Sequence, residues 1–354
     1  MSWHVYQGGR TVETPAPPPP FTPWGREDDP TGYVPEPGLR DAVNVALALG
    51  QPLLLTGDPG TGKTHLAHSL AYDLGAERAL VFDTKTTTSA QDLFYRYDAI
   101  RHFHDAQVGR GAPPVTEGAD GRARLDAIDY VHFEALGLAI LRAMDPAEAA
   151  PFLPPELRGG ARRRSVVLVD EIDKAPRDVP NDLLREIEAM SFRVRVPGSE
   201  RFPEFRADPA YRPITVLTSN SEKNLPDAFL RRCVFYHLEF PGTEQLREIV
   251  RRRLGPAQGG GGGTASASAP APAAGDEAVV DAAVREFYAI RELPLKKKPA
   301  TAEFLAWVRL LRERGLDVSR DRARRGGEIA VSYSVLAKTL EDLRLLRDRL
   351  ATTG

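Results

Sequence analysis

The sequence predicts an α/β fold in which a central parallel sheet is flanked by helices, followed by a smaller helical segment. Apolar strand-like runs alternate with helical runs between about residues 40 and 240, and strands that alternate with helices pair in parallel. Most of these runs are continuously apolar, as expected of strands that are covered on both faces. After residue 276 the pattern is helical only.

Each element follows from local signals in the chain. The predicted strands are residues 53–56, 79–82, 165–169, 214–218 and 234–240. Two predicted helices, 40–49 and 63–74, end at Gly50 and Gly75, because glycine readily adopts the left-handed conformation that closes a helix. Near the carboxyl end, a leucine stripe predicts core positions at Leu336, Leu340, Leu343 and Leu350.

Two composition breaks divide the chain. Residues 1–34 are rich in proline, with four in a row at 17–20, which predicts a flexible segment. The end of this segment, near residue 33, could instead pack beside a nucleotide base. Residues 255–276 contain mostly Gly, Ala, Ser and Pro, which predicts a flexible loop. We therefore expect an α/β domain at 35–242 and a helical domain at 243–350 that carries this loop.

Composition excludes several classes of protein. Hydrophobic residues make up 42% of the 354 residues, which excludes wholesale disorder. The 47 Lys+Arg are balanced by 49 Asp+Glu, and this near-neutral charge disfavours a bulk nucleic-acid binder. The single cysteine, Cys233, excludes an internal disulfide and a zinc site built from several cysteines. No basic and apolar leader stands at the amino terminus and no apolar run approaches the ~20 residues of a membrane span, so we expect a soluble, cytoplasmic protein.

A phosphate-binding motif follows the first predicted strand. Residues 57–64 read GDPGTGKT, which fits the pattern G-x-x-x-x-G-K-[ST] between a strand and a helix. Glycines allow successive backbone N–H groups to point at phosphate oxygens, Lys63 supplies a cation and Thr64 supplies a hydroxyl ligand for Mg²⁺. The candidate nucleotide-binding residues are Gly57, Asp58, Pro59, Gly60, Thr61, Gly62, Lys63 and Thr64.

A second motif places two acids at the end of a buried strand. Residues 165–173 read SVVLVDEID, so Asp170 and Glu171 stand where parallel sheets bind ligands. We expect Asp170 to hold Mg²⁺, directly or through water. Glu171 points elsewhere and can orient and polarise the attacking water.

Together, GDPGTGKT and VVLVDEID resemble the AAA+ ATPases, and the details most resemble the MoxR-type members, over about residues 35–250. The resemblance implies a P-loop NTPase fold with a small C-terminal α-helical lid, with ATP and Mg²⁺ as cofactors. It also implies that Asn220, after the strand at 214–218, contacts the γ-phosphate or the water. In the segment LPDAFLRRC it implies an arginine finger, an arginine that reaches the ATP of the neighbouring subunit, at Arg232, with Arg231 as the alternative. A finger that acts in trans requires a homo-oligomeric ring, and the resemblance implies a hexamer.

The chain departs from the family pattern in two places. Lys63 and Asp170 are 107 positions apart (170 − 63), and the surplus at about 95–160 fits the helix-two insertion of the MoxR-type clade. The apolar residues there predict a helix that includes Phe133, Leu136, Ile140 and Leu141. The lid's usual sensor arginine is missing from 299–304, where only the preceding lysines 296–298 could substitute.

A hairpin is expected before the strand at 214–218, from residues 192–196 and 201–205. It is either a purely structural element or one that faces the pore of the ring.

The resemblance implies an ATPase ring that remodels or matures a partner protein, often one with a von Willebrand factor A domain. The alternatives are a motor acting on nucleic acid and a nucleotide-binding signalling scaffold with little turnover. Basic clusters at 162–164, 251–253 and 296–298 are short, which favours solvated faces or subunit contacts over nucleic acid.

Overall fold

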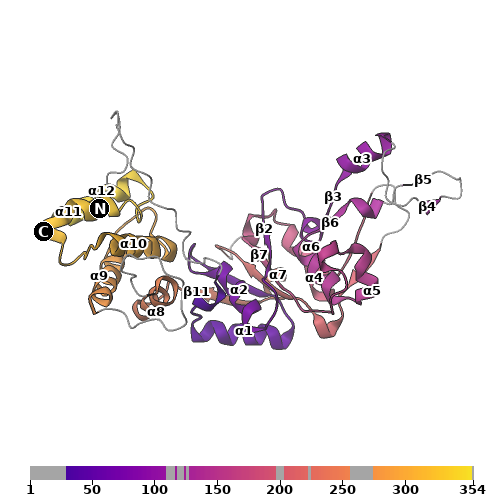
Figure 1. Ribbon diagram of the computed structural model, residues 1–354, viewed down its shortest axis with the longest axis horizontal. Coiled ribbons are helices and arrows are strands. Elements are labelled where there is room, and N and C mark those ends of the chain that lie inside the picture. The colour runs from indigo at the N-terminus through magenta and orange to yellow at the C-terminus, as the bar shows by residue number, and fades with distance from the viewer. Residues whose placement is uncertain are drawn as a thin grey trace. The chain divides into compact units, whose positions relative to one another are not determined.

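The computed structural model forms two compact units (Figure 1). One unit is Pro35–Phe240, and the other joins the residues before position 35 to the chain from Pro241 onward. The residues that the structure describes are 29–108, 116–117, 123–124, 127–196, 203–221, 225–255 and 274–352. The predicted flexible segments therefore lie, for residues 1–28 and 256–273, outside the described part of the chain.

A five-stranded parallel sheet forms the centre of the first unit, which confirms the predicted fold class. Its strands in spatial order are β11 (Val234–Leu238), β1 (Leu53–Gly57), β10 (Ile214–Thr218), β7 (Val166–Asp170) and β2 (Leu80–Asp83). Leu53 of β1 lies opposite Val216 of β10 and Val234 of β11, which fixes the register at the middle of the sheet. The last strand ends at Leu238, two residues before the predicted end.

The strand order decides where function can be built. β1, β10 and β7 are neighbours and run in the same direction, so their carboxyl ends meet at one edge of the sheet. Ligands of open parallel sheets bind outside that edge. Gly57, Asp170 and Thr218 are the last residues of these three strands and so belong to one site.

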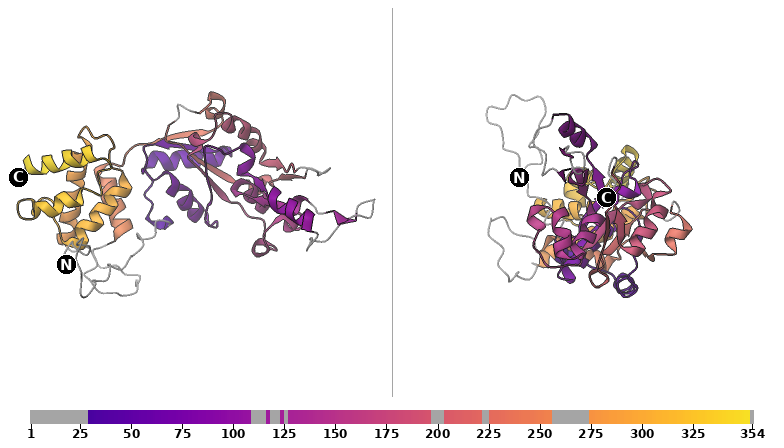
Figure 2. Two further views of the ribbon diagram at one scale, coloured as in Figure 1. Left: turned by 90° about the horizontal axis from the view of Figure 1, so that it is seen from above. Right: turned by 90° about the vertical axis from the view of Figure 1, so that its right-hand side faces the viewer.

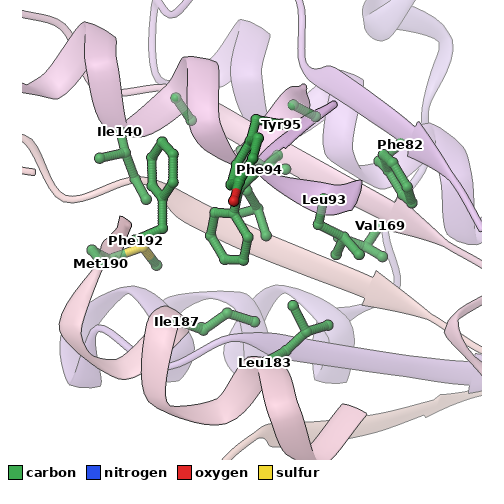
Figure 3. Packing of buried hydrophobic residues seen from close by; sticks show 14 of the residues in the cluster. Phe82, Leu93, Phe94, Tyr95, Ile140, Val169, Leu183, Ile187, Met190 and Phe192 are labelled. Atoms are coloured by element: carbon green, nitrogen blue, oxygen red, sulfur yellow. The ribbon is translucent and has the colours of Figure 1, made fainter. Parts of the chain in front are cut away.

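Helices cover the sheet and bury an apolar core. The longer helices of this unit are α1 (Pro37–Leu49), α2 (Lys63–Asp73), α3 (Ala99–Val108), α4 (Ala135–Ala143) and α6 (Val179–Ala189). α1 begins three residues earlier than predicted, because proline suits the first turn of a helix. Figure 3 shows part of the core, in which Ile140 of α4 and Leu183 of α6 belong to one buried cluster with Val169 of β7.

The range 95–160 contributes to this core both through helix α4 and through a pair of short strands. α4 packs against β2 and β7, and its residues Leu136, Ile140 and Leu141 are fully buried, as predicted for a helix here. Phe133 corrects the prediction, because it lies in strand β6 (Val131–Phe133), which pairs antiparallel with β3 (Tyr95–Tyr97). Its ring stands edge-on to Phe205 at 5.5 Å, so an aromatic contact holds it in the strand.

The predicted hairpin is present. β8 (Ser191–Arg193) pairs antiparallel with β9 (Glu204–Arg206), and Phe192 lies opposite Phe205. Their rings stack at 5.2 Å, which joins the two strands on the buried face. The remaining short elements of the unit are β4 (Thr116–Glu117), β5 (Ala123–Arg124), α5 (Pro146–Ala149), α7 (Asp227–Leu230) and the 3₁₀ turns η2 (Ala90–Leu93), η3 (Ala127–Tyr130), η4 (Ala150–Phe152), η5 (Pro155–Leu157), η6 (Ile172–Lys174) and η7 (Pro209–Tyr211).

The second unit is helical, and Figure 2 shows its helices packed side by side. They are η1 (Pro30–Gly32), α8 (Thr243–Leu254), α9 (Ala274–Arg291), α10 (Thr301–Arg314), α11 (Arg322–Ser332) and α12 (Leu340–Thr352). Trp307 is fully buried and its indole N–H donates to the Ser332 hydroxyl at 2.8 Å. Leu340 corrects the predicted core stripe, because it starts α12 and is 62% exposed, whereas Leu336 and Leu350 are buried.

Candidate functional site

The phosphate-binding motif forms the turn between β1 and α2. Gly57, Gly60 and Gly62 have φ values of 140°, 77° and 93°, which L-residues with a side chain rarely adopt. At Gly57 a Cβ would also lie 2.4 Å from the carbonyl oxygen of Leu238, so the neighbouring strand leaves room only for glycine. The turn therefore needs its glycines, and it leads directly into the amino terminus of α2, where free N–H groups favour anions.

The other residues of the motif occupy the same turn. Asp58 and Pro59 are exposed, while Thr61 is buried and its hydroxyl donates to the Asp58 carbonyl oxygen at 2.9 Å. This hydrogen bond closes the turn around the position where the motif would receive phosphate.

Lys63 is a buried cation held by three oxygen atoms. Its side chain is 7% exposed, and its Nζ donates to the carbonyl oxygens of Gly57 at 2.7 Å and Asp58 at 3.0 Å and to Asn220 Oδ1 at 3.1 Å. Burial lowers the pKa of Lys63, and the nearby carboxylates, Asp170 foremost, oppose that shift. A buried ammonium group beside carboxylates is a ready partner for phosphate oxygens.

Thr64 and Asp170 face each other across the site. The Thr64 hydroxyl lies 3.3 and 3.2 Å from the two carboxylate oxygens of Asp170. The hydroxyl of Thr218, the last residue of β10, also donates to Asp170. Three oxygen-bearing side chains therefore gather at the ends of α2, β7 and β10, and oxygen donors are the ligands that Mg²⁺ prefers.

Glu171 leaves the strand in a different direction from Asp170. Its backbone is left-handed, with φ 54° and ψ 50°, and its N–H donates to the Thr218 hydroxyl at 2.9 Å. This conformation is unfavourable for a residue with a side chain and recurs at functional sites. It turns the Glu171 carboxylate toward Lys174, which donates to it, and toward Asn220, whose Nδ2 lies 3.2 Å away.

The hydrogen bond from Lys174 lowers the pKa of Glu171, and a further hydrogen bond from Asn220 acts in the same direction. The carboxylate is therefore ionised at neutral pH. An ionised carboxylate can accept a hydrogen bond from a water molecule and orient it.

Two residues that the sequence analysis did not select belong to the site. The Thr218 hydroxyl donates to the Asp170 carboxylate and accepts from the Glu171 N–H. The sequence feature that could have identified Thr218 is a hydroxyl residue at the end of a predicted strand. Thr84 directly follows β2, and its backbone N–H donates to the Asp170 carbonyl oxygen at 3.2 Å. Its hydroxyl is buried and has no hydrogen-bond partner among the described residues. Only the position of β2 beside β7 places Thr84 here, and the sequence does not give that strand order.

The candidate arginines lie at the start of β11 and make different contacts. Arg232 forms an ion pair with Glu188 at the end of α6, with Nε and Oε1 2.9 Å apart, and both side chains are about half exposed. Arg231 is exposed. Neither forms a hydrogen bond or ion pair with the described residues of the phosphate site. Next to them, burial raises the pKa of the Cys233 thiol to about 12.

The three lysines considered for the lid belong to the helical unit and are exposed. Lys296 is paired with Glu341 at 2.6 Å, and its backbone N–H donates to Asp342.

Within the described residues, no group of three or more His, Cys, Asp or Glu side chains could hold a metal ion. In the same part of the chain, no helix has both the length and the apolar character needed to cross a membrane.

Residues 52–233 match the protein-family model for the AAA domain, dynein-related subfamily. Among solved structures, the chain is similar to the RuvB Holliday junction branch migration motor of Thermotoga maritima, with 15% identity and a TM-score of 0.38 over 79% of this chain and 62% of that chain. A substituted RuvB of the same organism gives 15% identity and a TM-score of 0.39 over 79% and 63%. The chain thus spans less than two thirds of the length of these structures. No curated protein sequence matches it.

Proposed function

The chain belongs to the AAA domain family, in its dynein-related subfamily, and is therefore a P-loop ATPase; from this premise we propose that it is a cytoplasmic MoxR-type member. In this proposal an oligomeric ring, a hexamer, couples ATP binding and hydrolysis to the remodelling or maturation of a partner protein. The helix-two insertion expected from the sequence supports the MoxR-type assignment, because the chain between α2 and β7 holds the additional elements β3, α3 and β6. The partner would be a client or adaptor, such as a protein with a von Willebrand factor A domain.

One observation carries the catalytic part of the proposal: Lys63, Asp170 and Glu171 converge at one edge of the sheet with Thr64 and Asn220. Lys63 and the N–H groups of the turn would bind the phosphates, and Thr64 with Asp170 would hold Mg²⁺. When bound, Mg²⁺ neutralises charge on the phosphate oxygens. Glu171 and Asn220 would hold and orient the attacking water.

The arginine that completes a neighbouring site would be Arg232, with Arg231 as the alternative. A guanidinium is permanently charged and planar, so it suits the charge that develops on a transferred phosphoryl group. Both arginines lie outside their own subunit's site, which fits a residue that serves an adjacent subunit.

The test is the substitution Glu171→Gln, which keeps the size of the side chain but removes its charge and replaces one acceptor oxygen with an NH₂ donor. We expect ATP affinity to stay within about threefold of wild type, while turnover falls by roughly 10²–10⁴-fold, the usual contribution of a positioned acid or base. Calorimetry measures the affinity and phosphate release measures turnover. Near-wild-type turnover would remove Glu171 from this role.

The same trapped variant addresses the partner. An ATP-bound ring that cannot hydrolyse should retain its client, so we expect a protein to co-purify with the Glu171→Gln chain in ATP and to dissociate in ADP. Turnover of the wild-type chain is then measured with that protein and, separately, with DNA and RNA. Stimulation by nucleic acid that falls steeply with salt would instead support the motor alternative.

A further inference from the structure

A groove lies in the first unit on elements that the nucleotide site does not use. Its volume is about 470 Å³, and it is bordered by α6, by the segment from η2 to the start of β3, and by the β8–β9 hairpin. These elements come from two separate parts of the sequence, around residues 90–95 and 185–206, and the fold brings them together. None of the phosphate-site residues lines the groove.

The floor of the groove is aromatic and tightly packed. Phe94, Tyr95 and Phe192 are 3%, 2% and 5% exposed, and Phe192 stacks on the other two rings with centroid separations of 5.1 and 6.1 Å (Figure 3). The Tyr95 hydroxyl accepts a hydrogen bond from the backbone N–H of Arg195 at 2.8 Å, which fastens the hairpin to the floor. The floor is therefore preformed, and its ring faces are covered by protein.

The rim of the groove is rich in arginine. The exposed residues Arg185, Arg193, Arg195 and Arg206 line it, against only two acids, Glu186 and Glu204. Glu204 already pairs with Arg193 at 2.8 Å and with Arg206 at 3.2 Å. Among the described residues no carboxylate forms an ion pair with Arg185 or Arg195. The rim thus keeps an excess of two positive charges (four minus two), in a chain whose formal net charge is −2.

Glu186 lines the groove and has one unsatisfied oxygen atom. Its Oε2 atom is buried and accepts no hydrogen bond from any described residue. A buried acceptor without a donor is unfavourable, and this one is covered by the protein itself.

We propose that this groove binds an extended acidic segment of a protein partner. Its carboxylates pair with Arg185 and Arg195, which hold planar guanidinium groups free for bidentate contacts. A nucleic acid fits less well, because its bases find no open ring face on which to stack. The inference rests on the proposed function in one respect: the segment belongs to the protein on which the ring acts.

The experiment measures binding of a fluorescently labelled peptide of about ten residues that repeats Glu-Ser, long enough to extend over roughly 33 Å. We compare the wild-type chain with Arg185→Glu/Arg195→Glu by fluorescence anisotropy. The matched control is Arg344→Glu/Arg347→Glu, which makes the same charge change at exposed positions of α12. A peptide that repeats Gln-Ser tests the need for charge, and a single-stranded oligothymidine of similar length tests the nucleic-acid reading.

We expect the groove variant to bind the acidic peptide at least tenfold more weakly than wild type, the control variant to match wild type, and the Gln-Ser peptide not to bind. Equal binding by the groove variant, or tighter binding of oligothymidine that the groove substitutions abolish, would overturn the proposal. ATP turnover without peptide is measured in the same samples. Absent turnover would contradict the proposed function, while normal turnover with unselective peptide binding would contradict the groove alone.

Discussion

The side-chain oxygen of Asn220 accepts a hydrogen bond from Nζ of Lys63 at 3.1 Å, across 157 positions of sequence. The Nδ2 atom of the same amide donates to Glu171 Oε1 at 3.2 Å. An ammonium group can only donate and an ionised carboxylate can only accept, so these two contacts fix the orientation of the amide. Asn220 therefore joins the cation proposed to bind phosphate to the carboxylate proposed to orient water.

Loss of the Asn220 amide should slow catalysis more than it weakens ATP binding. Asn220→Ala removes the link and leaves Glu171 held by Lys174 alone, so we expect kcat to fall by roughly 10²-fold, as for loss of one preorganised donor. ATP affinity should change less than about threefold, because Lys63 and the N–H groups of the turn remain. Steady-state kinetics and calorimetry together decide the point. A weaker affinity with unchanged kcat would assign Asn220 to binding instead.

Lys63→Ala should have the opposite signature. It removes the one buried cation that the described part of the phosphate site contains, and charge-assisted contacts to phosphate are among the strongest polar interactions in proteins. We expect ATP affinity to fall by roughly 10²-fold or more. Lys338→Ala, at an exposed position in the helical unit, is the control and should bind as wild type. Unchanged calorimetric affinity of Lys63→Ala would contradict the phosphate-site assignment.

The pair of Lys174 and Glu171 predicts a pH dependence. The hydrogen bond from Lys174 lowers the pKa of Glu171 below its usual value, so the carboxylate stays ionised as the pH falls. Lys174→Met removes this hydrogen bond and should raise that pKa. Activity that requires the ionised form will then be lost at a higher pH, and the acidic limb of the kcat profile should move upward. An unmoved or lowered limb would show that Glu171 does not control this limb.

Local motifs made the phosphate-site residues predictable from the sequence. The turn at 57–64 and the acids at 170–171 are specified by short patterns, so the ends of β1 and β7 could be assigned without a structure. Thr84 could not, because its place beside Asp170 depends on β2 pairing with β7 across a long insertion. Long-range strand order leaves no signal in a single sequence.

The two wrong predictions for apolar residues, Phe133 and Leu340, have a common cause. Phe133 fits a helical stripe by spacing, but pairing with β3 and contact with the hairpin place it in a strand. Leu340 fits the stripe of α12, yet it stands at the first turn and faces solvent. Periodicity identifies a face, whereas packing decides which members of that face are covered.

Arg231 and Arg232 predict complementation between inactive chains. Arg232→Ala would lack the residue that reaches a neighbour, and Lys63→Ala would lack its own phosphate site. In a mixed ring some sites combine an intact turn with an intact arginine, so we expect activity to reappear on mixing and to peak at intermediate ratios. Arg231→Ala, tested in parallel, should retain activity alone. No recovery at concentrations where ring formation is seen by ultracentrifugation would count against a finger in trans, and recovery with Arg231→Ala instead would reassign the role.

Gly137 allows the close approach of α4 to the backbone of Phe94, so replacing it should destabilise the fold. A Cβ at this position of α4 would lie 2.0 Å from the carbonyl oxygen of Phe94 and 2.9 Å from its carbonyl carbon, so α4 or the segment before β3 must move. Overpacking of this kind costs about 1–3 kcal/mol, and we expect Gly137→Ala to lower the free energy of unfolding by that amount. Gly327→Ala is the control, because no atom lies within 4 Å of the added Cβ in α11 and the helix gains about 0.5–1 kcal/mol. Urea unfolding measures both, and equal stability of the Gly137 variant and wild type would contradict this close approach of the two backbones.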